Sequence, residues 1–296
     1  MTSKRTVAIL EALLVTFLWS SSYILIKFGL DEIPPMTFAA YRYSLAAIAL
    51  LSYVLVRHRR CLLSMQRVAL AKYIALGFFG YFIAQGLQFF GLYYLQAITV
   101  TFLLNMTPIF VLLIGSATLK ELPDKRQFVG IGILLVGVAL FFYGEGLMFD
   151  QRLGILLTLA SGLGWAIYMT LTRSMVRGSD DSPVVLTSIS MASGAIMMTL
   201  ASFATQGTPD ISGHGVIVIA WLALVNTAAA FFLWNRALRN LKAYEQSILQ
   251  NSMLIQISIL AIIFLGEGIS AQKAFGIATM FLGVLLVIWK KGEIKK

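Results

Sequence analysis

Ten long apolar stretches dominate this sequence, and each is long enough to cross a lipid bilayer as a helix. A spanning helix needs about 20 mostly apolar residues. Only 12% of the 296 residues are charged, too few to cover a folded chain of this length in water. The predicted spans are residues 6–29, 36–56, 70–94, 97–119, 127–143, 152–173, 184–206, 215–238, 243–265 and 271–289. We therefore predict an all-α integral membrane protein with ten transmembrane helices.

Lysines and arginines are distributed unevenly among the connections between these spans. Cytoplasmic loops of membrane proteins carry an excess of such residues. Alternate loops and both chain ends hold most of them, whereas the opposite loops hold only Arg152 and Lys273. We therefore predict that both termini are cytoplasmic, with a basic tail at 290–296, and that the protein is multi-pass in the inner or plasma membrane. The net charge of +10 is then a topology signal, and we expect no nucleic-acid partner.

The two halves of the sequence match at a constant offset of 146 residues. The matching pairs are Trp19 and Trp165, Lys27 and Arg173, Asn105 and Asn251, Glu121 and Glu267, Gly130 and Gly276, and Gly137 and Gly283. Chance identity among apolar residues explains this less well, because Trp, Asn and Glu fall in one register. Each half holds five spans, so the second half must enter the membrane in the opposite orientation. We predict two inverted-topology five-helix repeats, at 6–143 and 152–289, which are typical of transporters that alternate access around a midplane site.

The glycines of these pairs are spaced seven residues apart in each half. Small residues at such spacing allow two membrane helices to approach closely. We therefore assign Gly130, Gly137, Gly276 and Gly283 to helix packing, with no chemical role.

Several motifs resemble those of a known family. They are Trp19-Ser20-Ser21-Ser22-Tyr23 leading to Lys27, Arg42 after Pro34-Pro35, Asn105-Met106-Thr107-Pro108, Lys120-Glu121, and Gly130 to Gly137. In this order, and together with the repeat, they resemble the EamA branch of the drug/metabolite transporter superfamily over nearly the whole chain. The resemblance implies a ten-helix bundle with a central cavity that exports amino acids or other metabolites.

Polar and aromatic residues within the spans mark a candidate substrate site, because polar groups in hydrocarbon normally face a cavity or the bundle interior. Thr101 and Asn105 share one helix face, and Asn251 holds a matching place in the second half. These groups either line a cavity or form hydrogen bonds between helices, as occurs in any bundle. The candidate substrate-binding residues are Trp19, Tyr23, Arg42, Gln85, Gln88, Thr101, Asn105, Trp165, Tyr168, Asn226, Gln246, Gln250 and Asn251.

The tryptophans and two basic residues within the spans each allow two interpretations. Trp19 and Trp165 fall near mid-membrane by residue count, so they either stack on an apolar or aromatic substrate or fill the core. Lys27 and Arg42 lie toward the outer ends of their helices, where they either extend to lipid headgroups or attract a substrate carboxylate. We interpret Lys27 in the first way. Arg42 has no counterpart in the second half, so we favour a functional or gating role for it.

Acidic residues are nearly absent from the spans. Only Glu11 lies inside one, toward its cytoplasmic end, and His58 and His214 both lie in connections. Proton-coupled transporters usually place a carboxylate or a histidine in the transport path. We therefore expect no central proton-coupling acid, with Glu11 as the remaining candidate for coupling. Facilitated movement of a zwitterionic or neutral metabolite fits this pattern.

These patterns predict an exporter of small metabolites such as amino acids that works by alternating access, with multidrug efflux as the alternative. A membrane enzyme would need a nucleophile with its base, or a metal cluster. The sequence offers neither, and the single cysteine, Cys61, excludes a cysteine cluster, so we expect no catalytic residue, metal or cofactor. The inverted repeat disfavours a channel. The expected partners are a small-molecule substrate and the lipid bilayer, and a monomer suffices because one chain holds both repeats.

Overall fold

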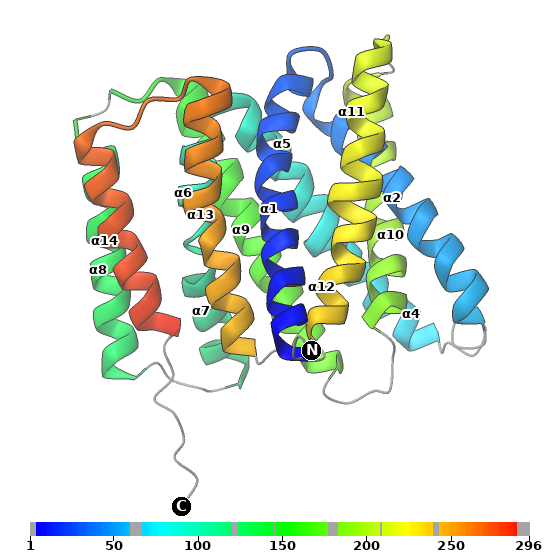
Figure 1. Cartoon of the computed structure of the whole chain (residues 1–296), viewed down its shortest axis with the longest axis horizontal. Helices are drawn as coiled ribbons and strands as arrows, with labels where there is room; N and C mark the ends of the chain where they lie inside the picture. Colours follow the sequence, from blue (N-terminus) through cyan, green and yellow to red (C-terminus); the bar gives the residue numbers. More distant parts are fainter. Residues whose placement is uncertain are drawn as a thin grey trace, which may run out of the picture.

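The computed structural model describes residues 4–59, 67–119, 124–144, 146–176, 183–207, 209–238 and 243–288, and all regular structure in them is helical (Figure 1). The elements are α1 (Lys4–Leu30), α2 (Pro35–Arg57), α4 (Arg67–Gly77), η1 (Phe78–Ile83), α5 (Ala84–Tyr94), α6 (Ala97–Leu104), α7 (Thr107–Leu119), α8 (Lys125–Phe142), α9 (Phe149–Val176), α10 (Pro183–Thr205), α11 (Gly213–Ala223), η2 (Leu224–Ala229), α12 (Ala230–Leu238), α13 (Ala243–Leu265) and α14 (Ala271–Ile288). Here η marks a π-helical turn.

The described helices are apolar and long enough to lie in a membrane. Eight helical segments in the described residues qualify as spans by length and composition, and Gln250–Leu265 and Ala271–Val287 are shorter apolar helices. Large apolar side chains project from the outside of the bundle, such as Val56 and Ile263, which are 81% and 66% exposed. Apolar surface of this extent is typical of a protein solvated by lipid. The chain is therefore a helical membrane protein.

The span predicted at residues 97–119 is interrupted, because the apolar segment that begins at Ala97 consists of two consecutive helices rather than one. The chain turns between Leu104 and Thr107, where α6 ends and α7 begins. Pro108 has no backbone N–H for the carbonyl of Leu104, which accepts instead from the Thr107 hydroxyl at 2.6 Å. At the matching position of the second half stands Leu254, and α13 is continuous there. The proline therefore makes the two halves locally unequal.

The third span of each half contains a π-helical turn. In the first half η1 joins α4 to α5, and in the second half η2 joins α11 to α12. η1 begins at Phe78 and η2 begins at Leu224, which are 146 residues apart, as in the sequence repeat. A π turn inserts one residue into the helix and rotates the following side chains, and such turns are frequent at functional sites. The repeat therefore extends to local backbone geometry.

Corresponding helices of the two halves pack against each other. At one edge of the bundle α8 lies beside α14 (Figure 1). A Cβ atom on Gly137 would lie 2.5 Å from the backbone nitrogen of Met280 and 2.9 Å from the carbonyl oxygen of Gly276. A Cβ atom on Gly283 would lie 2.7 Å from the carbonyl oxygen of Gly130. Side chains at these positions would separate the helices, so the predicted packing role of the four glycines is confirmed.

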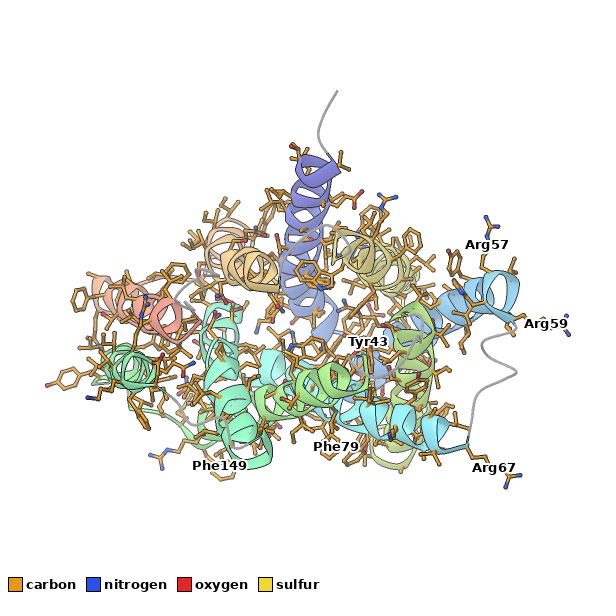
Figure 2. The ribbon with its side chains drawn as sticks, turned by 90° about the horizontal axis from the view of Figure 1, so that it is seen from below. Tyr43, Arg57, Arg59, Arg67, Phe79 and Phe149 are labelled. Atoms are coloured by element: carbon orange, nitrogen blue, oxygen red, sulfur yellow. The ribbon has the colours of Figure 1, made fainter. Side chains whose placement is uncertain are left out.

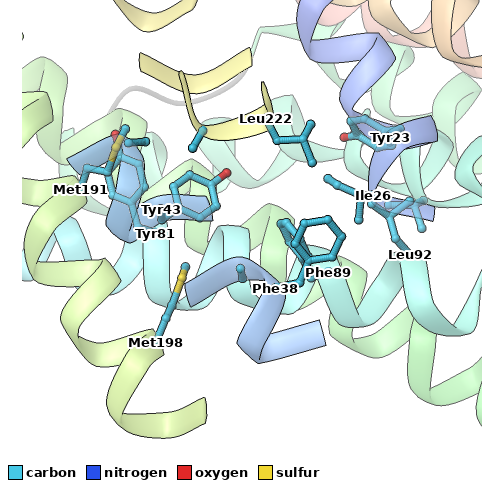
Figure 3. Packing of buried hydrophobic residues seen from close by; sticks show 14 of the residues in the cluster. Tyr23, Ile26, Phe38, Tyr43, Tyr81, Phe89, Leu92, Met191, Met198 and Leu222 are labelled. Carbon is cyan, nitrogen blue, oxygen red and sulfur yellow. The ribbon is translucent and has the colours of Figure 1, made fainter. Parts of the chain in front are cut away.

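Polar contacts join α2 to α10, the second helices of the two halves. The hydroxyls of Thr37 and Ser202 are 2.7 Å apart, and those of Ser44 and Thr199 are 3.2 Å apart. Further inside the bundle the ring of Phe38 on α2 packs edge to face against that of Phe89 on α5, with the ring centres 5.3 Å apart (Figure 3). Viewed from below, Tyr43 lies inside the bundle, whereas Arg57, Arg59 and Arg67 project from its periphery (Figure 2). The core thus lies where the two halves meet.

Candidate functional site

Arg42 is a buried cation on α2. The residue is only 5% exposed. Its Nε donates to Oγ1 of Thr227 at 2.9 Å, and its Nη2 lies 3.5 Å from Oγ of Ser22. Its guanidinium carbon lies 5.3 Å from the centre of the Tyr43 ring. No carboxylate in the described part of the chain forms an ion pair with it. A buried charge without a counter-ion is costly, which makes Arg42 a candidate for binding an anionic group.

Thr227 is the residue of η2 that binds Arg42. Its hydroxyl accepts from Arg42 and donates to the carbonyl of Leu222 at 2.8 Å, five residues earlier in the chain. The hydroxyl therefore accepts one hydrogen bond and donates another, which fixes its orientation. The π turn thus holds the arginine in one position.

Asn226, also in η2, has a hydrogen-bond acceptor without a partner. Its Nδ2 donates to the backbone carbonyl of Leu18 and lies 3.0 Å from Oγ of Ser21 and 3.1 Å from Oγ of Ser22. A carbonyl can only accept, so the nitrogen must face Leu18 and Oδ1 must face away. That oxygen is buried and has no hydrogen-bond partner among the described residues. Such an oxygen is unusual, because buried polar atoms in native proteins nearly always have a hydrogen-bond partner.

We call Ser22, Arg42, Asn226 and Thr227 the central polar cluster. Ser22 comes from α1 and Arg42 from α2, both in the first half, whereas the other two come from η2 in the second half. The cluster is therefore built jointly by the two halves.

Aromatic side chains from both halves lie beside this cluster. The ring of Trp19 is centred 5.4 Å from Phe231 and 5.1 Å from Trp234. Phe231 is 6.4 Å from Tyr81, which in turn is 5.7 Å from Tyr43. Tyr43 and Tyr81 are seen next to each other in Figure 3. These separations are typical of interacting aromatic rings.

The ring contacts continue into α9. Tyr81 lies 5.8 Å from Tyr168, which stacks on Trp165 at 4.9 Å. A Cβ atom on Gly80 would lie 2.6 Å from Cγ of Tyr168, so the missing side chain makes room for that ring. We call Trp19, Tyr43, Tyr81, Trp165, Tyr168, Phe231 and Trp234 the aromatic array.

The structure brings part of the predicted site together. Arg42 and Asn226 meet in the central polar cluster, and Trp19, Trp165 and Tyr168 belong to the aromatic array. Tyr23 is buried in the adjoining core. Gln85 accepts from the hydroxyl of Tyr43 at 2.7 Å and so supports the array.

Other predicted residues have local partners or lie elsewhere. Thr101 donates to the carbonyl of Ala97 at 2.8 Å, and Asn105 donates to the carbonyl of Thr101 at 2.8 Å, both within α6 and its end. These side-chain donors therefore bind backbone carbonyls of their own helix. Asn251 has a buried Nδ2 without a partner among the described residues. The remaining candidates are Gln88 and Gln250, which are half-buried, and Gln246, whose side chain lies outside the described residues.

Several residues of the site were not predicted. Thr227, Tyr81, Phe231 and Trp234 lie beside the predicted residues but carried no separate signal in the sequence. The repeat offers one clue, because it pairs Tyr81 with Thr227. Neither position stands out until the π turns are seen.

The interpretation of Lys27 as a residue that extends to lipid headgroups is wrong. Its Nζ donates to the carbonyls of Leu92 and Leu95, at 2.9 and 3.1 Å. These carbonyls lie at the C-terminal end of α5, where backbone acceptors are free and a cation is favourable. Lys27 therefore caps a helix of its own half.

Glu11, the candidate for coupling, forms an ion pair with Arg236 of α12. The side chain of Glu11 is 14% exposed and that of Arg236 is 54% exposed. The pair joins the first turns of α1 to the last turn of α12. It lies at the end of these helices, and no hydrogen bond or ion pair among the described residues links it to the central polar cluster.

A cavity lies at the opposite end of α1, which we call the distal end. Its volume is about 370 Å³, and it is lined by Leu30, Asp31, Glu32, Ile33, Pro34, Pro35, Phe90, Tyr93, Tyr94 and Gln206. None of the predicted substrate-binding residues whose side chains the structure describes lines it. The cavity is therefore distinct from the central polar cluster, none of whose four residues lines it.

The two halves are also joined at the distal end. Glu32 accepts from the backbone N–H of Ser212 and from its hydroxyl, the latter at 2.8 Å. These two hydrogen bonds hold the pKa of the Glu32 carboxyl below its usual value. Gln206 accepts from the backbone N–H groups that begin α2, of which Met36 is 3.0 Å away. Side chains of one half thus cap the helices of the other.

Glu267 makes the third contact of this kind. It lies in the connection after α13 and is only 7% exposed. Its two oxygens accept from the backbone N–H groups of Ala97 and Ile98, at 2.7 and 3.0 Å. An anion at the N-terminus of α6 satisfies free donors and the helix dipole together. The sequence repeat singled out this residue without indicating its role.

Comparison with known proteins supplies the family. Residues 6–143 and 152–289 each match the model of the EamA-like transporter family. The uncharacterized transporter YyaM of Bacillus subtilis (strain 168) is 26% identical over 273 residues, which cover 90% of this chain and 88% of that protein.

Two further relatives have more specific descriptions. A probable amino-acid metabolite efflux pump of Salmonella typhimurium (strain LT2) is 22% identical and is matched over 94% of this chain and 93% of its own length. An S-adenosylmethionine/S-adenosylhomocysteine transporter of Chlamydia trachomatis serovar L2 is 22% identical, with 95% and 88% covered. A crystal structure of a protein shares the fold, with a TM-score of 0.66 at 16% identity over 94% of this chain and 95% of its own. Since the family model covers both halves of the sequence, this chain belongs to the EamA-like transporter family.

Proposed function

We propose that this protein exports small metabolites such as amino acids by alternating access. The observation that carries the proposal is the contact between Arg42 and Thr227, at 2.9 Å, because it joins the two halves at a buried charge. When the halves move relative to each other, this contact and the central polar cluster around it would open toward one side and then the other. Polar groups at the interface of two repeats are where transporters of this kind bind their substrates.

The topology of the proposal has ten spans, with the second five-helix repeat inverted relative to the first. Ten crossings result if α6 and α7 together form one span and if α13 and α14 form one each. The alternation of basic residues supports cytoplasmic termini, which makes the distal end the outer one. The matched π turns, η1 and η2, support the repeat.

The charge of the site favours metabolites with a carboxylate over toxic cations. The buried guanidinium of Arg42 would repel an organic cation, and no carboxylate in the described residues compensates for it. The names of two relatives agree with the carboxylate, since S-adenosylmethionine and S-adenosylhomocysteine each carry an α-amino acid group and the other relative is described as a probable amino-acid metabolite efflux pump. Multidrug efflux is therefore the less favoured alternative.

The same residues argue for transport without a central proton-coupling acid. The central polar cluster contains a cation, an amide and two hydroxyls, none of which exchanges protons readily near neutral pH. Glu11 is already paired with Arg236 near the end of α1. Movement down the metabolite gradient then accounts for export.

The test is counterflow in proteoliposomes that contain the purified protein. Vesicles loaded with one unlabelled amino acid are placed in a solution of the same amino acid in labelled form. In parallel, vesicles loaded with an unlabelled toxic organic cation are placed in a solution of the same cation in labelled form. We expect saturable accumulation of labelled amino acids and no accumulation of cations, relative to protein-free vesicles. Accumulation of the cations alone would favour the multidrug alternative. Accumulation of neither would refute amino-acid transport and leave the family unchanged.

A further inference from the structure

Two groups in the central polar cluster have unused binding capacity, and both reach the same hydroxyl. Nη2 of Arg42 lies 3.5 Å from Oγ of Ser22, and Nδ2 of Asn226 lies 3.1 Å from it. The guanidinium and the amide are therefore neighbours across the boundary between the two halves. A ligand that binds the guanidinium and extends past Ser22 to Oδ1 of Asn226, on the side of the amide away from that hydroxyl, would meet both a positive charge and a neutral acceptor.

The guanidinium of Arg42 has more donors than the protein uses. It carries five N–H groups in a planar fork. In the described residues one of them binds Thr227, and a second makes only the long contact with Ser22. A carboxylate matches the remaining fork geometry and supplies the missing negative charge. The first unused capacity therefore indicates a carboxylate.

The amide of Asn226 offers the complementary group. Its Oδ1 is wholly buried, has no partner in the described part of the chain, and accepts hydrogen bonds only. An ammonium or a hydroxyl on the carbon next to the carboxylate would donate to it. Because the amide is neutral, it binds both kinds of donor without requiring a positive charge. The second unused capacity therefore indicates a donor adjacent to the carboxylate.

The surroundings indicate what the rest of the ligand is. Tyr43 follows Arg42 directly in the chain and begins the aromatic array, which continues through Tyr81 to Tyr168. Among the described residues this array presents rings from both halves and no charged group. It suits an apolar or aromatic side chain.

We propose that Arg42 and Asn226 form a recognition subsite for α-amino and α-hydroxy acids that carry apolar or aromatic side chains. This inference rests on the proposed transport function and names its substrate class. The carboxylate is required because it alone satisfies the buried charge. The α-ammonium is not required as a charge, and a hydroxyl replaces it.

The test is equilibrium binding to the full-length protein in lipid nanodiscs, measured by isothermal titration calorimetry. The probes form two matched series. One contains phenylalanine, phenyllactate, phenylpropionate, phenethylamine and phenylalanine methyl ester, and the other contains leucine with its hydroxy acid, desamino acid, amine and methyl ester. Each series removes the carboxylate or the donor separately.

In at least one series we expect the amino acid and the hydroxy acid to bind alike. The desamino acid should bind about 3- to 10-fold more weakly, because one hydrogen bond to a neutral acceptor is lost. The amine and the ester should bind at least about 10- to 100-fold more weakly, because the guanidinium is left unpaired. Amines or esters that bind as well as the acids would overturn the inference, and so would the absence of binding by every acid.

Variants locate the effect. Arg42→Gln should weaken binding of the acids about 10- to 100-fold without weakening binding of the amine, and Arg42→Lys should restore part of it. Arg236→Gln is the matched control, since it removes the same charge from the exposed end of α12, and it should leave the order of the probes unchanged. If the Arg42 variants fail to fold, the two probe series on the unaltered protein still decide the question. A protein that transports amino acids but binds amines equally well would refute this inference alone, whereas one that transports no metabolite would refute the proposed function.

Discussion

Tyr81 and Thr227 occupy the same position, the fourth residue, of two π-helical turns that lie 146 residues apart. In the first half this position presents an aromatic ring, which contacts Tyr43 and Tyr168. In the second half it presents a hydroxyl, which accepts from Arg42. The two repeats therefore share the backbone geometry at this position but differ in side chain. Here the second half contributes to the polar side of the site, and the first half contributes to the aromatic side. A substrate with a charged group and an apolar body would match this division.

Removal of the Thr227 hydroxyl tests whether it holds Arg42. In Thr227→Val the Nε of Arg42 loses its partner in a buried place, so we expect the free energy of unfolding to fall by about 1–3 kcal/mol. Thr227→Ser retains the hydroxyl and should recover most of the loss. The measurement is the thermal unfolding midpoint of the purified protein in detergent. Equal midpoints for the Val and Ser variants would show that the hydrogen bond contributes little.

Substitutions of two glycines in α8 should have opposite outcomes. The Cβ atom in Gly137→Ala would lie 2.5 Å from the backbone nitrogen of Met280, and overpacking of this kind costs about 1–3 kcal/mol. Gly132 lies in the same helix, and a Cβ atom there would have nothing within 4 Å, so Gly132→Ala should be neutral or stabilise by up to about 1 kcal/mol. Thermal unfolding of both variants provides the comparison. A Gly137→Ala protein as stable as the Gly132→Ala protein would contradict the close packing of α8 on α14.

The contact between Glu32 and Ser212 should make the stability of the distal end depend on pH. The folded protein lowers the pKa of Glu32, so the stabilisation is present in full above the unfolded value of about 4.3 and is lost as the pH falls through the folded pKa. Wild type should therefore exceed Glu32→Gln in thermal midpoint near neutral pH, and the difference should shrink in acid. Ser212→Ala keeps the backbone donor and should show a smaller difference. A difference between wild type and Glu32→Gln that stays constant across the acid range would refute the linkage.

The membrane architecture could be predicted from the sequence, because bilayer thickness sets the length of each apolar stretch. The break after Leu104 was also accessible in principle, since Pro108 removes a backbone donor. The site was harder to predict. Thr101 and Asn105 share a helix face as predicted, but Ser, Thr and Asn side chains readily bind the backbone of their own helix, and these two do so.

The contact between Arg42 and Thr227 was beyond the reach of sequence patterns. The two residues are 185 positions apart, and their meeting depends on how α2 packs against η2. The extra residue in a π turn also rotates the side chains that follow it. Residues after the turn therefore do not lie on the helix face that the regular period of about 3.6 residues predicts. Asn226 could be identified as polar within a span, whereas its unpartnered oxygen is visible only in three dimensions.

The ion pair of Glu11 predicts how transport responds to a pH gradient. Glu11 is bound to Arg236 between α1 and α12, and in the described part of the chain no hydrogen bond or ion pair links it to the central polar cluster, so its protonation should not accompany substrate movement. We expect Glu11→Gln to transport labelled amino acids into proteoliposomes at a rate similar to wild type, with or without an imposed pH gradient. Arg236→Gln serves as the control for loss of the ion pair itself, since both variants break the same contact. Gradient-driven accumulation that is present in wild type, retained in Arg236→Gln and lost in Glu11→Gln would establish Glu11 as a proton-coupling residue, because only the carboxylate would then matter.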